Sequence, residues 1–269
     1  PRRPETHGLH LYTNAQVGAW FGEFMHPDWD MFQSGHEWGA YHAAGRAVSG
    51  APIYVSDKPG THDFGLLRQL VCSDGSALLA DDPGRPTVDC LFCDQTRQPV
   101  PLKIFNRNGP RGVVGLFNAQ YHPEHDKKVT VDGTVAPADV PTLEGPAFAA
   151  FAQRSGRVWQ CGRDDVHAVR LAEREWEIVS YAPITRGVAV IGLADKLNSG
   201  GAIIAERWRD EQTLEVELRD GGELLGWSQH APRAVEAGGI RVAHTFDPAS
   251  GTLRATSRTL GRQTVVIRR

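Results

Sequence analysis

Residues Phe24–Gly60 read FMHPDWDMFQSGHEWGAYHAAGRAVSGAPIYVSDKPG, and this stretch decides the fold of the first part of the chain. Its two ends, HPDWDMF and PIYVSDKPG, have the pattern of short strands. Between them, His36–Val48 predicts a helix, because its apolar and small residues follow one broad stripe. A strand, a helix and a strand in this order form a βαβ unit, which makes the strands parallel with a right-handed crossover. We therefore expect an α/β fold here.

Both predicted strands finish on an acidic residue, Asp30 in the first and Asp57 in the second. Polar ligands of α/β folds bind at the carboxyl ends of neighbouring parallel strands. The sequence therefore predicts that the two carboxylates lie at one edge of the sheet and face a polar ligand.

The segments on either side of this unit predict two more helices. His7–Trp20 has a helix-compatible spacing of apolar residues and leads into a strand expected over Gly22–Trp29. Asp63–Val71 predicts a helix after the unit, with Thr61 as its N-cap.

The pattern changes after Cys72, and from Leu102 onward short β runs replace helices. The sequence Asp220-Gly-Gly222 is a strong signal for a hairpin. Frequent short strands separated by turn residues predict an antiparallel β-sandwich. We expect an α/β part over 1–72, a linker over 73–101 and an all-β part over 102–269. The expected strands are 102–106, 112–118, 128–131, 175–181, 187–193, 202–206, 213–218, 223–228, 240–246, 253–258 and 264–267.

Composition excludes several classes of partner. The formal net charge is −3 and no basic run exceeds a pair, which argues against a nucleic-acid or anionic-membrane surface. No apolar run approaches the roughly 20 residues that span a bilayer. The four cysteines are few for a disulfide-built fold, so a reducing compartment, the cytoplasm, is expected. The sequence contains no GxSxG, Walker or GxGxxG motif, and we expect no cofactor.

Several blocks together resemble a known family. GEFMHPDWDMFQS, AAGRAV, PIYVSDKPG, PGRPTVDCLF, LKIFN, GVVGLFN and RGVAVIGLADKLNS are similar to the raffinose synthase and seed-imbibition-protein group, which are alkaline α-galactosidase-like members of glycoside hydrolase family 36. The resemblance covers most of Gly22–Ala202, and its blocks occur in the family's order.

This resemblance implies a TIM-type (β/α)8 barrel followed by a C-terminal antiparallel β-sandwich. Phe24–Met31 would be the seventh barrel strand and Pro52–Asp57 the eighth. The family's catalytic aspartates follow the fourth and sixth strands, so they would precede Pro1 and no catalytic residue is expected in this chain. The chain would be the carboxyl-terminal portion of a longer enzyme, inactive alone, with the remainder of the barrel as its partner and an apolar flank left open.

The resemblance also implies a substrate site made of Trp29, Asp30, Met31 and Asp57. A carboxylate at Asp30 would accept hydrogen bonds from adjacent sugar hydroxyls and favour one epimer. Trp29 could stack on a sugar ring, although burial is the commoner fate of tryptophan. The alternatives are that Asp30 caps its own loop and that Asp57 forms a turn or pairs with Lys58.

Two other groups of residues could hold a metal. His26, His36 and His42 lie near these acids, but His36 and His42 are six residues apart and fall on opposite sides of a helix. Cys90 and Cys93 form a single CxxC without a second pair. We therefore predict no metal site.

Three functional hypotheses follow. In the first, the parent protein is a retaining α-galactosidase or a raffinose-synthase-type galactosyltransferase that acts on galactinol and raffinose-family sugars. In the second, the chain is non-catalytic and its β-sandwich serves as a packing or carbohydrate-binding module. In the third, an unrelated α/β hydrolase uses the aspartates and histidines within 26–42.

Overall fold

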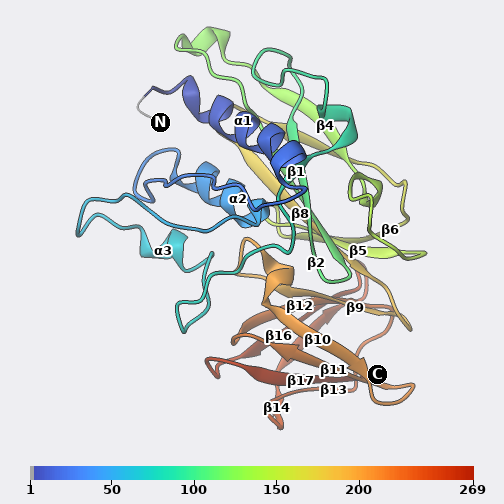
Figure 1. Cartoon of the computed structure of the whole chain (residues 1–269). Helices are drawn as coiled ribbons and strands as arrows, with labels where there is room; N and C mark the ends of the chain where they lie inside the picture. Colours follow the sequence, from blue (N-terminus) through green and yellow to red (C-terminus); the bar gives the residue numbers. More distant parts are fainter. Residues whose placement is uncertain (1–2) are drawn as a thin grey trace.

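A computed structural model describes residues 3–269. The α-helices of the described residues are α1 (Thr6–Phe21), α2 (Gly39–Ser49) and α3 (Phe64–Leu67). Helices α1 and α2 and a large antiparallel sheet lie side by side in one half of the molecule, and a two-sheet sandwich forms the other half (Figure 1). Within 3–269, no helix combines the length and the hydropathy needed to cross a membrane.

Helix α2 confirms the central helix of the sequence analysis, but it begins at Gly39, three residues later than predicted. The backbone N–H of Trp38 donates to Nδ1 of His36 at 3.1 Å, which holds the preceding turn outside the helix. The helix ends at Ser49, and its C-cap residue Gly50 has a φ of 67°, in the left-handed region. Only glycine fits there, because a Cβ would lie 2.0 Å from the carbonyl oxygen of Asp82.

The segments before and after α2 run parallel, as the βαβ pattern predicts, but they barely form strands. A single parallel bridge joins Phe32 to Val55, and the Ser56 N–H donates to the Phe32 carbonyl at 2.9 Å. The strand expected over Gly22–Trp29 is absent from the structure. Pro27 lacks the N–H that a ladder needs, and the chain from 22 to 31 is irregular.

The third helix, α3, is shorter than predicted and has a different cap. It covers Phe64–Leu67 rather than 63–71. Asp63 is its N-cap in place of Thr61, because the Asp63 carboxylate accepts the Leu66 N–H at 3.0 Å.

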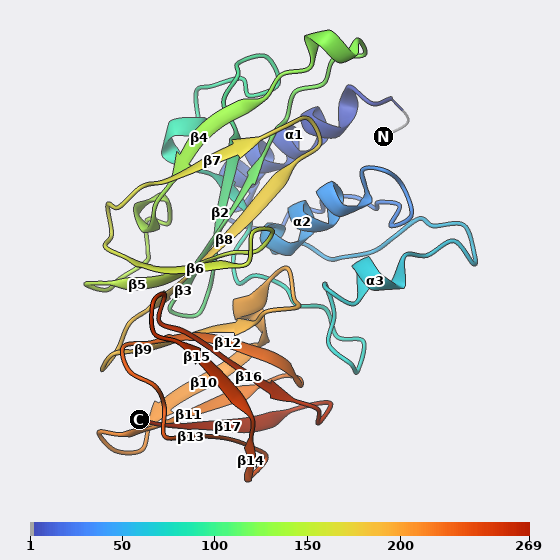
Figure 2. The same ribbon diagram turned by 180° about the vertical axis from the view of Figure 1, so that it is seen from behind.

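A six-stranded antiparallel sheet occupies the middle of the molecule, in the order β1-β2-β3-β8-β5-β6. One face is covered by α1 and α2, and the opposite face by a two-stranded sheet, as the view from behind shows (Figure 2). Close approach of α1 requires a glycine at Gly8, where a Cβ would lie 2.0 Å from the Ala119 carbonyl oxygen. The strands are β1 (Arg85–Pro86), β2 (Leu102–Asn108), β3 (Arg111–Phe117), β8 (Trp176–Pro183), β5 (Phe148–Ala152) and β6 (Arg157–Cys161), and the covering pair is β4 (Val131–Val135) and β7 (His167–Leu171).

A second all-β unit follows and forms a two-sheet sandwich, so the sandwich expected over 102–269 is confined to residues 188–268. A five-stranded sheet, β10-β11-β17-β13-β14, faces a four-stranded sheet, β15-β16-β12-β9, across a core of aliphatic side chains. These strands are β9 (Val188–Leu193), β10 (Ile203–Trp208), β11 (Thr213–Leu218), β12 (Gly222–Ser228), β13 (Ala234–Ala237), β14 (Ile240–Val242), β15 (His244–Asp247), β16 (Thr252–Ser257) and β17 (Gln263–Arg268).

The Asp220-Gly-Gly222 turn does not close a hairpin, contrary to the sequence prediction. It joins β11 in the five-stranded sheet to β12 in the four-stranded sheet. Asp220 is buried, and its carboxylate accepts the backbone N–H groups of Ser73, Gly221 and Gly261 and the Ser73 hydroxyl. The turn is therefore a crossing between sheets, tied to a segment 147 residues earlier in the chain.

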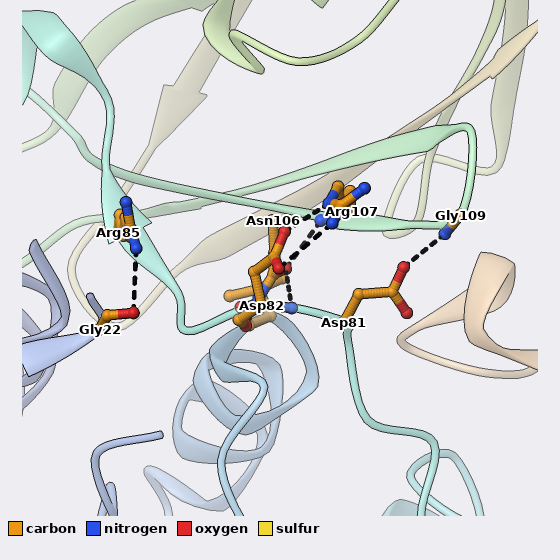
Figure 3. Close-up of polar contacts among 8 residues, drawn as sticks. Gly22, Asp81, Asp82, Arg85, Asn106, Arg107 and Gly109 are labelled. Carbon is orange, nitrogen blue, oxygen red and sulfur yellow. Dashed lines mark hydrogen bonds and ion pairs between the residues drawn. The ribbon is translucent and has the colours of Figure 1, made fainter. Parts of the chain in front are cut away.

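Residues 73–101, predicted as a linker, are built into both β units. Leu78, with Cys72 just before the segment, packs in the core of the sandwich, and β1 adds an edge strand to the six-stranded sheet. Figure 3 shows the middle of this segment, where the Asp82 carboxylate pairs with Arg107 and the Asp81 carboxylate accepts the Gly109 N–H.

Candidate functional site

The candidate site is a short exposed turn around Asp30 in the irregular segment before the parallel bridge. Asp30 adopts a φ of 62°, a left-handed conformation that few residues other than glycine, asparagine and aspartate tolerate. The Asp28 carboxylate accepts the Asp30 N–H at 2.8 Å, and the Asp30 carboxylate accepts the Met31 N–H at 2.7 Å. Asp30 and Met31 are both exposed, so this turn presents a carboxylate beside a thioether.

Asp28 connects this turn to the second parallel segment. Its other carboxylate oxygen accepts the Tyr54 hydroxyl at 2.6 Å. Tyr54 alternates with Ile53 and Val55, which pack toward the helices, so Tyr54 faces the other way. The exposed face of the two parallel segments therefore carries the polar side chains, while the opposite face packs on the helices.

Trp29, which the sequence proposed as a sugar contact, is buried and cannot touch a ligand. The Trp29 side chain is 0% exposed and belongs to the core formed by the helices and the six-stranded sheet. An indole buried on both faces offers no surface for a sugar ring to stack on. The sequence could not decide between sugar stacking and burial for Trp29, because alternation along an irregular segment does not tell which residue turns inward.

The carboxylates of Asp30 and Asp57 do not share a site. The parallel bridge aligns Phe32 with Val55, so Asp30 lies two residues before the bridge and Asp57 two residues after it. Asp57 accepts the N–H and the hydroxyl of Ser34, at 2.8 and 2.7 Å. These bonds fix the loop that leads into α2 and leave Asp57 a supporting part rather than half of a carboxylate pair.

A network of buried histidines and one arginine lies beneath the turn. Arg46 of α2 donates to the carbonyl oxygens of Trp29 at 2.6 Å and Asp30 at 3.1 Å, and to Nδ1 of His42 at 2.8 Å. His42 contacts His7 of α1, with 2.7 Å between Nε2 and Nδ1. Arg46, His7 and His10 did not draw attention in the sequence, and His42 was considered only as a metal ligand or as a residue of a hydrolase. An arginine inside AAGRAV, among small residues on a helix expected to be buried, was the available signal.

This network occupies both ring nitrogens of His42 and one of His7, which disfavours these two residues as metal ligands or proton carriers. Burial, and then the charge of Arg46, hold the pKa of His42 far below its usual range, and burial lowers the pKa of His7 to about 4. His26 is directed to the Gly50 carbonyl, 3.2 Å away. No group of three metal-ligating side chains occurs among residues 3–269. The third functional hypothesis, a hydrolase that uses the aspartates and histidines within 26–42, therefore has no accessible base at His42.

The CxxC cysteines are separate thiols. Cys90 is buried with its Sγ 3.6 Å from the Pro101 carbonyl oxygen, and the Cys93 thiol lies 3.0 Å from the Gln98 side-chain oxygen. Burial raises the pKa of both thiols, which disfavours the thiolate needed for metal binding or disulfide exchange.

Large apolar side chains are exposed along α1 and the turn that follows it. Trp20 is 78% exposed and Phe24 71%, values that are high for aromatic residues. Contiguous exposed apolar surface marks a contact face in most proteins. The exposed apolar residues of this flank are Leu9, Trp20, Phe21, Phe24 and Met25.

Comparison with known proteins places the chain in a family. The model of the family described as raffinose synthase or seed imbibition protein Sip1 matches residues 4–256. The chain belongs to this family. The match covers α1, the Asp30 turn, the six-stranded sheet and nearly all of the sandwich, so the family resemblance extends beyond the blocks over Gly22–Ala202 that first suggested it.

Three curated relatives show the extent of the similarity. A probable galactinol–sucrose galactosyltransferase 1 of Arabidopsis thaliana is 39% identical over 95% of this chain and 38% of its own length. A galactinol–sucrose galactosyltransferase of Oryza sativa subsp. japonica is 37% identical over 86% of the chain and 33% of its own length. A stachyose synthase of Pisum sativum is 30% identical over 87% and 30%. The chain thus spans only about two fifths or less of the length of these relatives.

Among solved structures, a GH27 β-L-arabinopyranosidase from Geobacillus stearothermophilus overlaps 66% of this chain and 43% of its own, with a TM-score of 0.44 and 12% identity. The family assignment rests on the sequence match, and the fold on the strand pairings described above.

Proposed function

We propose that this chain is the carboxyl-terminal part of a retaining enzyme that moves α-linked galactose. In the reaction, a galactosyl group passes from a donor such as galactinol to a sugar acceptor such as sucrose, by two displacements at the anomeric carbon. The two catalytic carboxyl groups of a retaining enzyme lie about 5 Å apart. We place both of them in polypeptide outside this chain and assign no catalytic residue here.

The observation that carries this proposal is the rigid, exposed turn at Asp30 in a chain of this family. A carboxylate that accepts two adjacent hydroxyls leaves itself unpaired when one hydroxyl points the other way, and this discriminates between epimers. Asp30 has a fixed backbone and an exposed carboxylate beside Met31. We assign Asp30 the role of binding galactose hydroxyls, Met31 contact with the apolar edge of the sugar, and Asp57 a supporting role.

The open apolar flank supports a larger catalytic unit. The two parallel segments carry α2 on one face only, and the opposite face presents Asp28, Asp30 and Tyr54. Exposed aromatic side chains line the neighbouring flank at α1. We propose that these segments are the last two strands of a (β/α)8 barrel, whose remaining strands cover the flank and face the same interior.

The test uses the intact protein that contains this chain and compares it with Asp30→Asn. We expect galactose transfer from galactinol to sucrose, and a kcat/KM lower by roughly 100-fold in the variant, because an amide both donates and accepts where the carboxylate only accepts. Release of galactose from an aryl α-galactoside distinguishes hydrolysis from transfer. The matched control is Asp132→Asn, an exposed carboxylate on β4 paired with Arg170, with activity close to that of the parent. If the intact protein shows neither transfer nor hydrolysis, the proposal is wrong.

A second role is favoured for the β-sandwich, namely packing against the α/β part. The Leu197 N–H donates to the Gln69 carbonyl at 2.9 Å, and the Lys196 ammonium donates to the Arg68 carbonyl at 2.8 Å. Both bonds hold the chain that follows α3. We propose that the sandwich fixes this last helical segment rather than binding sugar itself. Sugar binding by the sandwich, followed through tryptophan fluorescence, would contradict this role.

We propose a reducing compartment, the cytoplasm, as the site of action. All four cysteines are unpaired thiols in the described chain, and three of them are buried. No cofactor is part of the proposed reaction, since the chemistry of glycosyl transfer needs only carboxyl groups and bound hydroxyls.

A further inference from the structure

We infer that Arg46 is a positioning residue: from within α2 it fixes the orientation of the Asp30 carboxylate, and with it the preference for galactose over its epimers. This inference rests on the proposed function of Asp30 and adds the group that holds Asp30 in place. Arg46 does not touch the sugar, because its side chain is 1% exposed and lies beneath the turn.

The guanidinium of Arg46 binds the two carbonyl groups that flank the Asp30 backbone, those of Trp29 and of Asp30 itself. One terminal nitrogen donates to the Trp29 carbonyl at 2.6 Å and to the Asp30 carbonyl at 3.1 Å. Two carbonyls in succession converge on one donor only when the residue between them turns sharply. The φ of 62° at Asp30 is this turn, so loss of the guanidinium would free Asp30 to return to an extended conformation.

The hydrogen-bond directions in the network follow from the chemistry of arginine, which only donates. Because the other terminal nitrogen of Arg46 donates to Nδ1 of His42, the proton of His42 must lie on Nε2. That proton points to Nδ1 of His7, 2.7 Å away, and His7 must accept it. The orientation of the guanidinium is therefore fixed by a chain of neutral imidazoles that ends in α1.

His10 is a second hydrogen-bond partner of the Trp29 carbonyl. Its Nε2 lies 3.0 Å from the Trp29 oxygen and 3.1 Å from the Arg46 nitrogen. That nitrogen already uses its two hydrogens on the carbonyls of Trp29 and Asp30. His10 must then carry its proton on Nε2 and donate it to Trp29, whose carbonyl receives hydrogen bonds from two sides.

The charge of Arg46 is kept although it is buried. Burial lowers the pKa of Arg46 to about 10, which still leaves the group protonated at neutral pH. Among the described residues no carboxylate forms an ion pair with Arg46, and an unpaired buried charge is costly. An aliphatic side chain would serve packing alone at lower cost, which favours a role for the donors themselves.

The experiment compares Arg46→Met, Arg46→Lys and Arg111→Met in the intact protein. Arg111 is the matched control, a buried arginine that donates to the Val190 carbonyl and pairs with Glu206 in the β units. We expect Arg46→Met to lower kcat/KM for an aryl α-galactoside by about 100-fold, because misplacement of a binding group by about 1 Å has this effect. Its preference for the galactoside over the glucoside should fall at least tenfold. Lysine keeps the charge but not the two-pronged geometry, so Arg46→Lys should lie in between.

A second measurement follows the Asp30 turn directly, so the test still holds if an Arg46 variant loses activity for a reason other than a displaced turn. In the intact protein, hydrogen–deuterium exchange at the Asp30 and Met31 backbone amides should be faster in Arg46→Met than in the parent, while Arg111→Met should not change it. An unchanged epimer preference in Arg46→Met, with Asp30→Asn impaired, would overturn the inference and leave the proposed function intact. A normal epimer preference in Asp30→Asn would instead overturn the proposed function, whatever Arg46 does to the turn.

Discussion

At the scale of single residues, a buried polar network holds an exposed carboxylate. The family blocks in the sequence point to Asp30 and Met31, and both residues are exposed. The sequence could not reveal Arg46, His10 or His7, because their bonds join α1 to α2 and depend on packing across about 35 residues of chain. Local patterns indicate where a strand or helix lies, whereas the partner of a buried side chain is set by the tertiary contacts.

The neutral histidines give the protein a defined dependence on pH. The pKa of His42 is depressed on folding, so its contribution to stability is complete above the unfolded value near 6.5 and is lost as the pH falls below it. Between pH 7 and pH 5 each such imidazole should lower the free energy of unfolding by about 2 kcal/mol. Urea unfolding at both pH values measures this loss.

His42→Gln provides the control for that prediction. A glutamine can accept from Arg46 and donate to His7 without titrating. We expect the loss of stability between pH 7 and pH 5 to shrink by about 2 kcal/mol in this variant, the share of one imidazole. An identical pH dependence in the two proteins would mean that the pKa of His42 does not change on folding.

At the scale of elements, the sequence predicts helices and strands that have a strong apolar periodicity. It misses strands and turns whose form depends on neighbouring strands. Helix α2 and ten of the strands were located within a few residues, because their apolar periodicity is strong. Strand β5, FAAFA, was missed since alanine favours helices; it forms a strand because β8 and β6 flank it. The Asp220 turn has the composition of a hairpin, and only its bonds to distant residues show that it crosses between sheets.

Asp220 should be the most sensitive residue of the sandwich. Although burial opposes its charge, hydrogen bonds from Ser73, Gly261 and Gly221 lower the pKa of Asp220. Its contribution is therefore present above a pH of about 4 and is lost as the pH falls through the folded value. We expect Asp220→Ala to lower the free energy of unfolding by about 3 kcal/mol, because buried N–H groups lose their acceptor.

Ser73→Ala is the matched comparison for Asp220. It removes the hydroxyl bond and leaves the bonds from the backbone N–H groups, so a loss of about 1 kcal/mol is expected in chemical denaturation. Equal losses for the two substitutions would show that the serine hydroxyl, and not the carboxylate as a multiple acceptor, holds the crossing.

At the scale of the whole molecule, three hydrophobic layers hold the chain together and one flank remains open. The helices, the six-stranded sheet and the sandwich each bury apolar faces against a neighbour. Around α1, aromatic residues face outward instead. The resemblance to a barrel enzyme predicted such a flank, and the size and position of the exposed side chains agree with a contact face for further polypeptide.

The flank can be tested in the 269-residue chain. We expect this chain to bind a hydrophobic dye such as ANS and to associate at micromolar concentration, because Trp20, Phe21 and Phe24 are exposed within one short stretch of chain. The double variant Trp20→Glu, Phe24→Glu should reduce both signals. Leu260→Glu, at a 74% exposed position of the sandwich, is the control and should change neither. Dye binding that persists in the double variant would place the exposed surface elsewhere.

The segment over 72–86 has a practical consequence for recombining members of this family. Cys72 and Leu78 pack in the sandwich core, while Asp82 and β1 bond to the six-stranded sheet. In a chimaera joined at residue 101, the sandwich of one relative would therefore be packed by core residues of the other. A junction placed before Cys72 keeps Cys72 and Leu78 in the same parent sequence as the sandwich core that they pack in. Exchange experiments between relatives should therefore succeed or fail according to which side of this segment the crossover falls.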